Sequence, residues 1–149
     1  MSSHSIEIED RLAIQDLLSR YCHAMDASRA DLCIELFTDD ATIHTPVGEP
    51  RGRAGILEWI EGRLALRAPD YQVGHYVLNS LMTRSSPNSV KVRSMFLYTR
   101  QRRDGSSNAE LLGAGIYEDE ARKETAGWRF SVRRFSIASP PLDSGFFSR

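Results

Sequence analysis

Residues 14–26 read IQDLLSRYCHAMD, and this stretch decides how the fold begins. Its apolar side chains recur at spacings of three and four, the period of an amphipathic helix; they are Ile14, Leu17, Leu18, Tyr21, Cys22 and Met25. The pattern predicts a helix over residues 8–27. Asp26 follows Leu18 and Cys22 at four-residue spacing, so its carboxylate ends an apolar line. A carboxylate there is costly to bury without a partner, and the alternative is that it caps the helix end in solvent.

Two more helices and one strand are predicted in the rest of the first half. The predicted segments are a short helix at 30–36, a strand at 41–45 and a helix at 53–67. Asp39 and Asp40 are expected to turn the chain into that strand. Pro46 and residues 48–52 are typical of a loop between the strand and the third helix.

From Val73 onward the apolar pattern changes from the helical period to the alternation of β-strands. The predicted strands are residues 74–84, 89–103, 109–121 and 127–138. The turns between them are short, which favours antiparallel hairpins over crossover connections. Helices followed by a meander indicate an α+β domain, in which a curved sheet wraps against the helices.

Length and composition narrow the possible classes of protein. The 149 residues fit a single domain, residues 1–149, with a core over 8–138 and an irregular tail at 139–149. A net charge of −1 gives no electrostatic reason to expect nucleic acid as a partner. No apolar run approaches the ~20 residues of a membrane span, and no signal-peptide layout opens the chain. The expected location is therefore the cytoplasm.

The cysteine and metal-binding patterns of the sequence indicate neither a disulfide framework nor a metal site. Cys22 and Cys33 are the only cysteines, so no disulfide framework is expected. Neither a CxxC pair nor an HExxH motif occurs, and no metal site is predicted.

His75 is the first candidate for acid–base chemistry. It opens the strand predicted at 74–84, and Asn79 is expected on the same face of that strand. The ordinary pKa of imidazole suits proton transfer near neutrality, and an aspartate bonded to one ring nitrogen fixes the tautomer and stabilises the cation. Asp26 is the candidate for that aspartate. A structural histidine with satisfied hydrogen bonds is the alternative interpretation.

Three further side chains could assist. Tyr21 lies in the apolar stripe, where its hydroxyl could bond a leaving hydroxyl or an enolate oxygen, or simply pack in the core. Arg133 and Arg134 are adjacent in the last strand, so alternation points one of them inward, where a guanidinium could bind an oxyanion. His44, at the end of the first strand, is a reserve candidate for the pocket.

Five segments together are similar to one known family. They are Ile14–Tyr21 running to Asp26, Leu36–Ala41, Gly52–Ile56, His75–Asn79 and Gly127–Phe130 ahead of Arg133. In this order and spacing, over about residues 8–138, the chain resembles the SnoaL-like branch of the nuclear transport factor two-like, or cystatin-like, superfamily. Members include scytalone dehydratase, bile acid 7α-dehydratase and lindane dehydrochlorinase.

The resemblance implies a cone-shaped, strongly bent mixed sheet closed by three helices around a deep apolar pocket. It implies an Asp26–His75 catalytic dyad, with Tyr21 as a polar helper, and it favours Arg133 over Arg134. Asn79, His44, Phe96 and Trp59 are the expected substrate-binding residues. One departure from scytalone dehydratase is that the strand at 89–103 contains no second histidine.

The function expected from this resemblance is a cofactor-independent lyase or isomerase, similar to a dehydratase. Its substrate would be a small apolar carbonyl or hydroxyl compound, and the protein would be a homodimer or higher homo-oligomer. Two alternatives stay open: a polyketide cyclase that closes rings by aldol chemistry, and a non-catalytic subunit for assembly or ligand binding, as in ring-hydroxylating dioxygenases.

Overall fold

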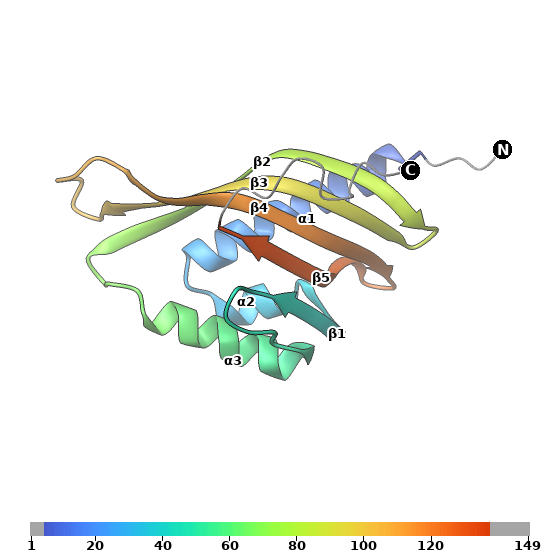
Figure 1. The fold of residues 1–149 in the computed structure, drawn as a ribbon, viewed down its shortest axis with the longest axis horizontal. Helices are drawn as coiled ribbons and strands as arrows, with labels where there is room; N and C mark the ends of the chain where they lie inside the picture. Colours follow the sequence, from blue (N-terminus) through green and yellow to red (C-terminus); the bar gives the residue numbers. More distant parts are fainter. Residues whose placement is uncertain (1–4, 138–149) are drawn as a thin grey trace.

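A computed structural model describes residues 5–137, which form three helices and five strands. In chain order the elements are α1 (Ile8–Asp26), α2 (Ala30–Ile34), β1 (Phe37–His44), α3 (Gly52–Ala65), β2 (Tyr71–Ser86), β3 (Ser89–Arg102), β4 (Glu110–Glu124) and β5 (Gly127–Ser136). The strands make one sheet in the order β1-β5-β4-β3-β2. β1 and β5 are parallel and the other pairs antiparallel, so the predicted α+β fold with a mixed sheet is confirmed. The sheet is not closed into a barrel (Figure 1).

The core lies between the sheet and the helices, which cover one of its faces (Figure 1). All six apolar residues of the predicted α1 stripe are buried. Ile56 and Ile60 of α3, spaced by four, are fully buried as well. These helical side chains pack in one cluster with Phe37 and Phe130, whose rings lie 5.4 Å apart across the parallel strands. The sheet and the helices are therefore held together by apolar burial, the largest favourable contribution to folding.

The start of β1 was predicted wrongly. The strand begins at Phe37, four residues before the expected position, and α2 ends earlier, at Ile34. The cause is the pairing with β5: the amide of Phe130 donates to the carbonyl of Leu36 at 2.8 Å, and the buried Phe37 ring fills the core. Asp40 therefore lies within the strand, where its carboxylate pairs with Arg122 of β4 at 2.5 Å.

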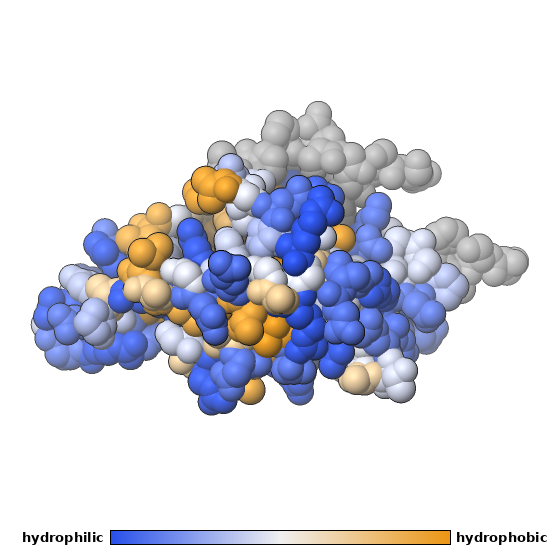
Figure 2. All heavy atoms as spheres, turned by 90° about the horizontal axis from the view of Figure 1, so that it is seen from below, coloured by the Kyte–Doolittle hydropathy of each residue, from blue (hydrophilic) through white to orange (hydrophobic). Residues whose placement is uncertain are grey.

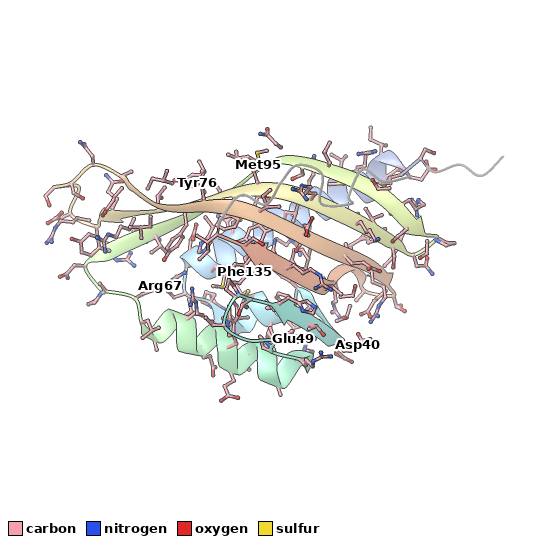
Figure 3. The ribbon with its side chains drawn as sticks, in the orientation of Figure 1. Asp40, Glu49, Arg67, Tyr76, Met95 and Phe135 are labelled. Carbon is pink, nitrogen blue, oxygen red and sulfur yellow. The ribbon has the colours of Figure 1, made fainter. Side chains whose placement is uncertain are left out.

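The predicted alternation of β2 fails at Asn79. Its φ of +51° lies in the left-handed region, and the register with β3 shifts between Leu78 and Leu81. The bulge turns Asn79 to the exposed outer face, with its Nδ2 3.5 Å from the sulfur of Met95. Met95 lies on the face of the sheet away from the helices (Figure 3). The expectation that His75 and Asn79 share a face is wrong.

A buried carboxylate fastens the beginning of α1 to the sheet. Asp10 accepts hydrogen bonds from Trp128 Nε1 at 2.9 Å, Lys123 Nζ at 2.8 Å and Arg84 Nη2 at 3.4 Å. The hydrogen bond from Lys123 is the main reason that the pKa of Asp10 lies below its ordinary value. Asp10 thus ties one helix to the ends of three strands.

Within residues 5–137, no helix has the length and apolar character that crossing a membrane requires.

Candidate active site

Asp26 and His75, far apart in the sequence, are in direct contact. Oδ1 of Asp26 lies 2.5 Å from Nδ1 of the His75 ring. The same carboxylate also accepts from the His75 backbone amide, at 3.0 and 3.1 Å. The two side chains are only 23% and 12% exposed, so the pair is sheltered from bulk solvent. A carboxylate on Nδ1 fixes the ring tautomer that carries its proton there and leaves Nε2 with a lone pair.

The end of α1 is fixed by side chains from two directions. Nε2 of Gln72 donates to the backbone carbonyl of Asp26 at 3.0 Å, and Nη1 of Arg67 donates to that of Met25. These carbonyls belong to the last turn of the helix, beyond the reach of intrahelical amides, and the carbonyl of Met25 also accepts from the amide of Ser28 at 3.1 Å. Arg67 Nη1 also lies 3.2 Å from the hydroxyl of Ser28, whose φ of +55° turns the chain away. The position of the Asp26 carboxylate is therefore fixed by its surroundings.

His75 borders a cavity of about 480 Å³ between the sheet, α1 and α3. This volume suits a small organic ligand. The lining is mostly apolar and aromatic and comprises Tyr21, Met25, Trp59, Arg63, Leu66, Arg67, Ala68, Tyr71, Val73, His75, Phe96, Tyr98, Arg100, Leu112, Gly113, Tyr117, Phe135 and Ile137. Arg67 and Phe135 lie in the space between the sheet and α3 (Figure 3). On the face seen in Figure 2, hydrophobic residues gather in patches in the left half and centre, among hydrophilic ones.

Tyr21 lies at the floor of this cavity. It is 4% exposed, and its ring makes edge contacts with Phe37, Tyr117 and Phe130, with centroids 6.0–6.3 Å apart. Burial raises the pKa of Tyr21 well above its ordinary value, so its hydroxyl stays protonated. A protonated phenol at this position can donate a hydrogen bond to a bound oxygen.

Arg133 lies behind the floor and not on the cavity surface. It is 1% exposed, and its guanidinium carbon lies 4.0 Å from the ring centroids of both Tyr21 and Tyr117. Its Nε and Nη2 donate to the two oxygens of Asp119, each at 3.0 Å. Burial lowers the pKa of Arg133, but the charge and hydrogen bonds of Asp119, together with the two tyrosines, outweigh burial, so this pKa lies above its ordinary value. The inward side chain is thus Arg133, but its enclosure contradicts the expected direct contact with substrate.

Of the four expected substrate-binding residues, two line the cavity and two do not. Phe96 and Trp59 line the cavity. His44 does not line the cavity, and its Nδ1 lies 3.2 Å from the carboxylate of Glu49. Glu49 is a loop residue close to the start of α3, whereas Arg67 follows the other end of that helix (Figure 3). The bulge carries Asn79 to the other face of the sheet. The expectation that His44 and Asn79 line the cavity is therefore wrong.

Sequence reasoning missed several cavity residues. Tyr98 pairs with His75 in the β2–β3 register, and their rings lie 4.8 Å apart. Arg63 follows Trp59 by four residues on α3, a spacing that places both on one face of the helix, so this signal was present in the sequence. No comparable signal exists for Asp119, because only the register of β4 against β5 brings it opposite Arg133.

No group of three or more His, Cys, Asp or Glu side chains that could hold a metal ion is found in the described part of the chain.

Several solved structures share this fold. A protein from Novosphingobium aromaticivorans, provisionally named as an aromatic ring hydroxylase, aligns with a TM-score of 0.78 and 29% identity over 91% of this chain and 94% of its own. LinA aligns with a TM-score of 0.71 and 25% identity over 87% of this chain and 86% of its own. A second N. aromaticivorans protein, provisionally named as a scytalone dehydratase, has a TM-score of 0.75 and 20% identity over 88% and 85% of the two chains. At 20% identity the likeness concerns the fold alone.

The sequence itself places the chain in a family. No curated protein matches it. The model of the SnoaL-like domain matches residues 6–134, which cover the three helices and almost the whole sheet. The chain therefore belongs to the SnoaL-like domain family.

Proposed function

We propose that this protein is a lyase or isomerase that removes a proton from a small, largely apolar substrate without a cofactor. The observation that supports this most is the contact between Asp26 and His75 at the edge of an apolar cavity. An imidazole held by a carboxylate is suited to general base catalysis near neutral pH.

In the proposed reaction, Nε2 of His75 takes a proton from a carbon next to a carbonyl group. The electron pair of the broken C–H bond forms an enolate or a double bond, and in an elimination the leaving group departs with its own electron pair. His75 becomes a cation, which the carboxylate of Asp26 stabilises from the other ring nitrogen. The C–H electron pair stays on the carbon framework and the leaving group keeps its bonding pair, so there is no net redox change and the step requires no oxidant or reductant.

Tyr21 is the proposed hydrogen-bond donor to the leaving hydroxyl or to the enolate oxygen. It borders the same cavity as His75, and burial keeps its hydroxyl protonated. Arg133 would act through this phenol, since its positive charge lies against the Tyr21 ring. A nearby cation makes a phenol a stronger hydrogen-bond donor, so Arg133 is a positioning residue in this proposal.

The test is proton exchange and elimination with a panel of β-hydroxy ketones on aromatic and steroid frameworks, in heavy water, followed by mass spectrometry. The wild-type protein should incorporate deuterium or release water. His75→Ala should lower the rate by roughly 10²–10⁴-fold, the usual contribution of a positioned acid or base. His23→Ala is the matched control, because His23 is an exposed histidine of α1. A rate for His75→Ala within a few-fold of wild type would refute the role of His75.

A homo-oligomer is the proposed assembly. Tyr76, Leu78, Leu81 and Met95 are each 43–52% exposed on β2 and β3, and Tyr76 and Met95 lie on the outer face of the sheet (Figure 3). Large apolar side chains grouped on one surface favour burial against another chain. Light scattering of the wild type should give a mass above that of one chain, and Met95→Lys should lower it. A monomeric wild type contradicts this assembly.

A further inference from the structure

The charged groups that line the cavity are unevenly distributed. Among the described residues, three arginines, Arg63, Arg67 and Arg100, contribute to its wall, and no carboxylate does. Asp26, the acid of the candidate site, is not part of the wall, and its carboxylate is hydrogen-bonded by the ring and the backbone amide of His75. The cavity surface therefore carries positive charge only.

In the part of the chain that the structure describes, two of these guanidinium groups have no acidic partner. Arg100 is paired with Glu110, with Nε 2.8 Å from the carboxylate. Arg67 donates to a backbone carbonyl and to a hydroxyl, which leave its charge uncompensated. Arg63 contacts only the ring of Trp59, with its guanidinium carbon 5.8 Å from the centroid. Within residues 5–137, neither Arg63 nor Arg67 forms an ion pair with an aspartate or glutamate.

These two arginines lie near one another in the chain, and one of them contacts the end of α1 that carries Asp26. Trp59 and Arg63 are four residues apart on one face of α3, and Arg67 follows just after the helix ends. From there Arg67 donates to the carbonyl of Met25, the residue next to Asp26. Arg67 and His75 line the same cavity, so a ligand held by Arg67 shares that space with the His75 ring.

The exposed part of the cavity wall is apolar as well as cationic. Leu66, Leu112 and Ile137 belong to the cavity wall, and each is between 42% and 82% exposed. Exposed leucine and isoleucine beside unpaired arginines match a ligand that combines an apolar body with a negative charge.

We propose that the substrate carries a carboxylate, which Arg63 and Arg67 bind while its apolar body lies toward His75. This inference rests on the proposed function, because it takes the cavity as the substrate site. Guanidinium groups bind carboxylates through paired, charge-assisted hydrogen bonds. In a partly enclosed cavity this attraction is screened less than it is in bulk water.

The test compares two probes of equal shape, 2-naphthoate and its neutral amide, 2-naphthamide, by titration of the ¹⁵N-labelled protein and NMR. Naphthoate should shift the amide signals around Arg67 and His75 and bind about tenfold more tightly than naphthamide. Arg63→Gln should remove most of this preference, and high salt should reduce it. Arg63 has no hydrogen bond or ion pair in the described part of the chain, so its replacement leaves the fold intact.

Arg11→Gln is the matched control, because it removes the same charge from an exposed position in the first turns of α1. It should keep the full preference for naphthoate. Equal affinities for the two probes, a preference that survives Arg63→Gln, or the lack of any saturable shift at the cavity would each overturn the proposal. This experiment measures binding alone, so His75→Ala should retain the preference for naphthoate over naphthamide. The catalytic role of His75 is tested separately, by the exchange and elimination assay.

Discussion

One carboxylate, that of Asp26, bonds both the ring and the backbone amide of His75. The amide bonds fix the start of the strand against the end of α1, and the ring bond fixes the orientation of the imidazole. Because both depend on the same group, the position of His75 in the sheet and the tautomer of its ring are coupled. Asp26 is thus a structural link between α1 and β2, and in the proposed function it is also the partner of the catalytic ring.

Asp26→Asn should therefore lower turnover more than it lowers stability. An amide oxygen can still accept from the His75 backbone, but it carries no charge to stabilise the imidazolium that forms during proton transfer. We expect turnover to fall by about 10²–10⁴-fold while the circular dichroism spectrum is unchanged. Asp16→Asn, at an exposed position of the same helix, is the control. Equal turnover in the two variants would exclude a catalytic role for Asp26.

Stability should depend on the pH through Asp10. The pKa of this carboxyl is lowered in the folded protein, so its contribution is present above the unfolded value of about 4 and is lost as the pH falls through the folded pKa. Asp10→Asn should reduce the free energy of unfolding at pH 7 by about 1–3 kcal/mol, as expected for hydrogen bonds to a charged group. Urea unfolding at several pH values measures this difference, which should shrink below pH ~4.

Glu9→Gln is the control for this measurement, since Glu9 is exposed and precedes Asp10 on α1. It should leave the free energy of unfolding nearly unchanged across the same pH range. A stability difference for Asp10→Asn that stayed constant down to pH 2 would show that the charge of Asp10 is not what holds α1 to the sheet.

The buried ion pair between Arg133 and Asp119 should also contribute to the stability of the fold. Asp119→Asn removes the charge that compensates a guanidinium exposed by only 1%, which should cost about 3–5 kcal/mol in urea unfolding. Replacing both residues, Arg133→Met with Asp119→Leu, should cost less than that single change. Glu120→Gln, on the next residue of β4, is the control. A single variant as stable as wild type would mean that Arg133 is solvated.

Features of the fold that depend on residues close together in the chain are the ones best predicted from the sequence. The α1 stripe is read correctly because the helical period depends on nearby residues only, and it directs attention to Asp26. The pairing of His75 with Asp26 comes from the family resemblance, since periodicity alone left a structural histidine open. Asn79 and the partner of Arg133 could not be predicted, because the β2 bulge and the β4–β5 register depend on neighbouring strands.

Gly115 should be the glycine of β4 that tolerates a side chain least. A Cβ atom at this position would lie 1.9 Å from the carbonyl oxygen of Ser136 and 2.8 Å from the ring of Phe96. The oxygen belongs to the backbone of β5, so it can move only if the two strands separate. Overpacking of this kind typically costs 1–3 kcal/mol, and we expect Gly115→Ala to lower the free energy of unfolding by about the upper end of that range.

Gly113 provides the comparison, two residues away on the same strand. A Cβ atom there meets nothing within 4 Å, and the position lines the cavity. Gly113→Ala should leave the free energy of unfolding unchanged or raise it slightly, because alanine restricts the unfolded chain more than glycine does. Urea unfolding of both variants tests the packing of β4 against β5 beside the cavity. Equal stabilities would mean that the strands do not approach each other this closely at Gly115.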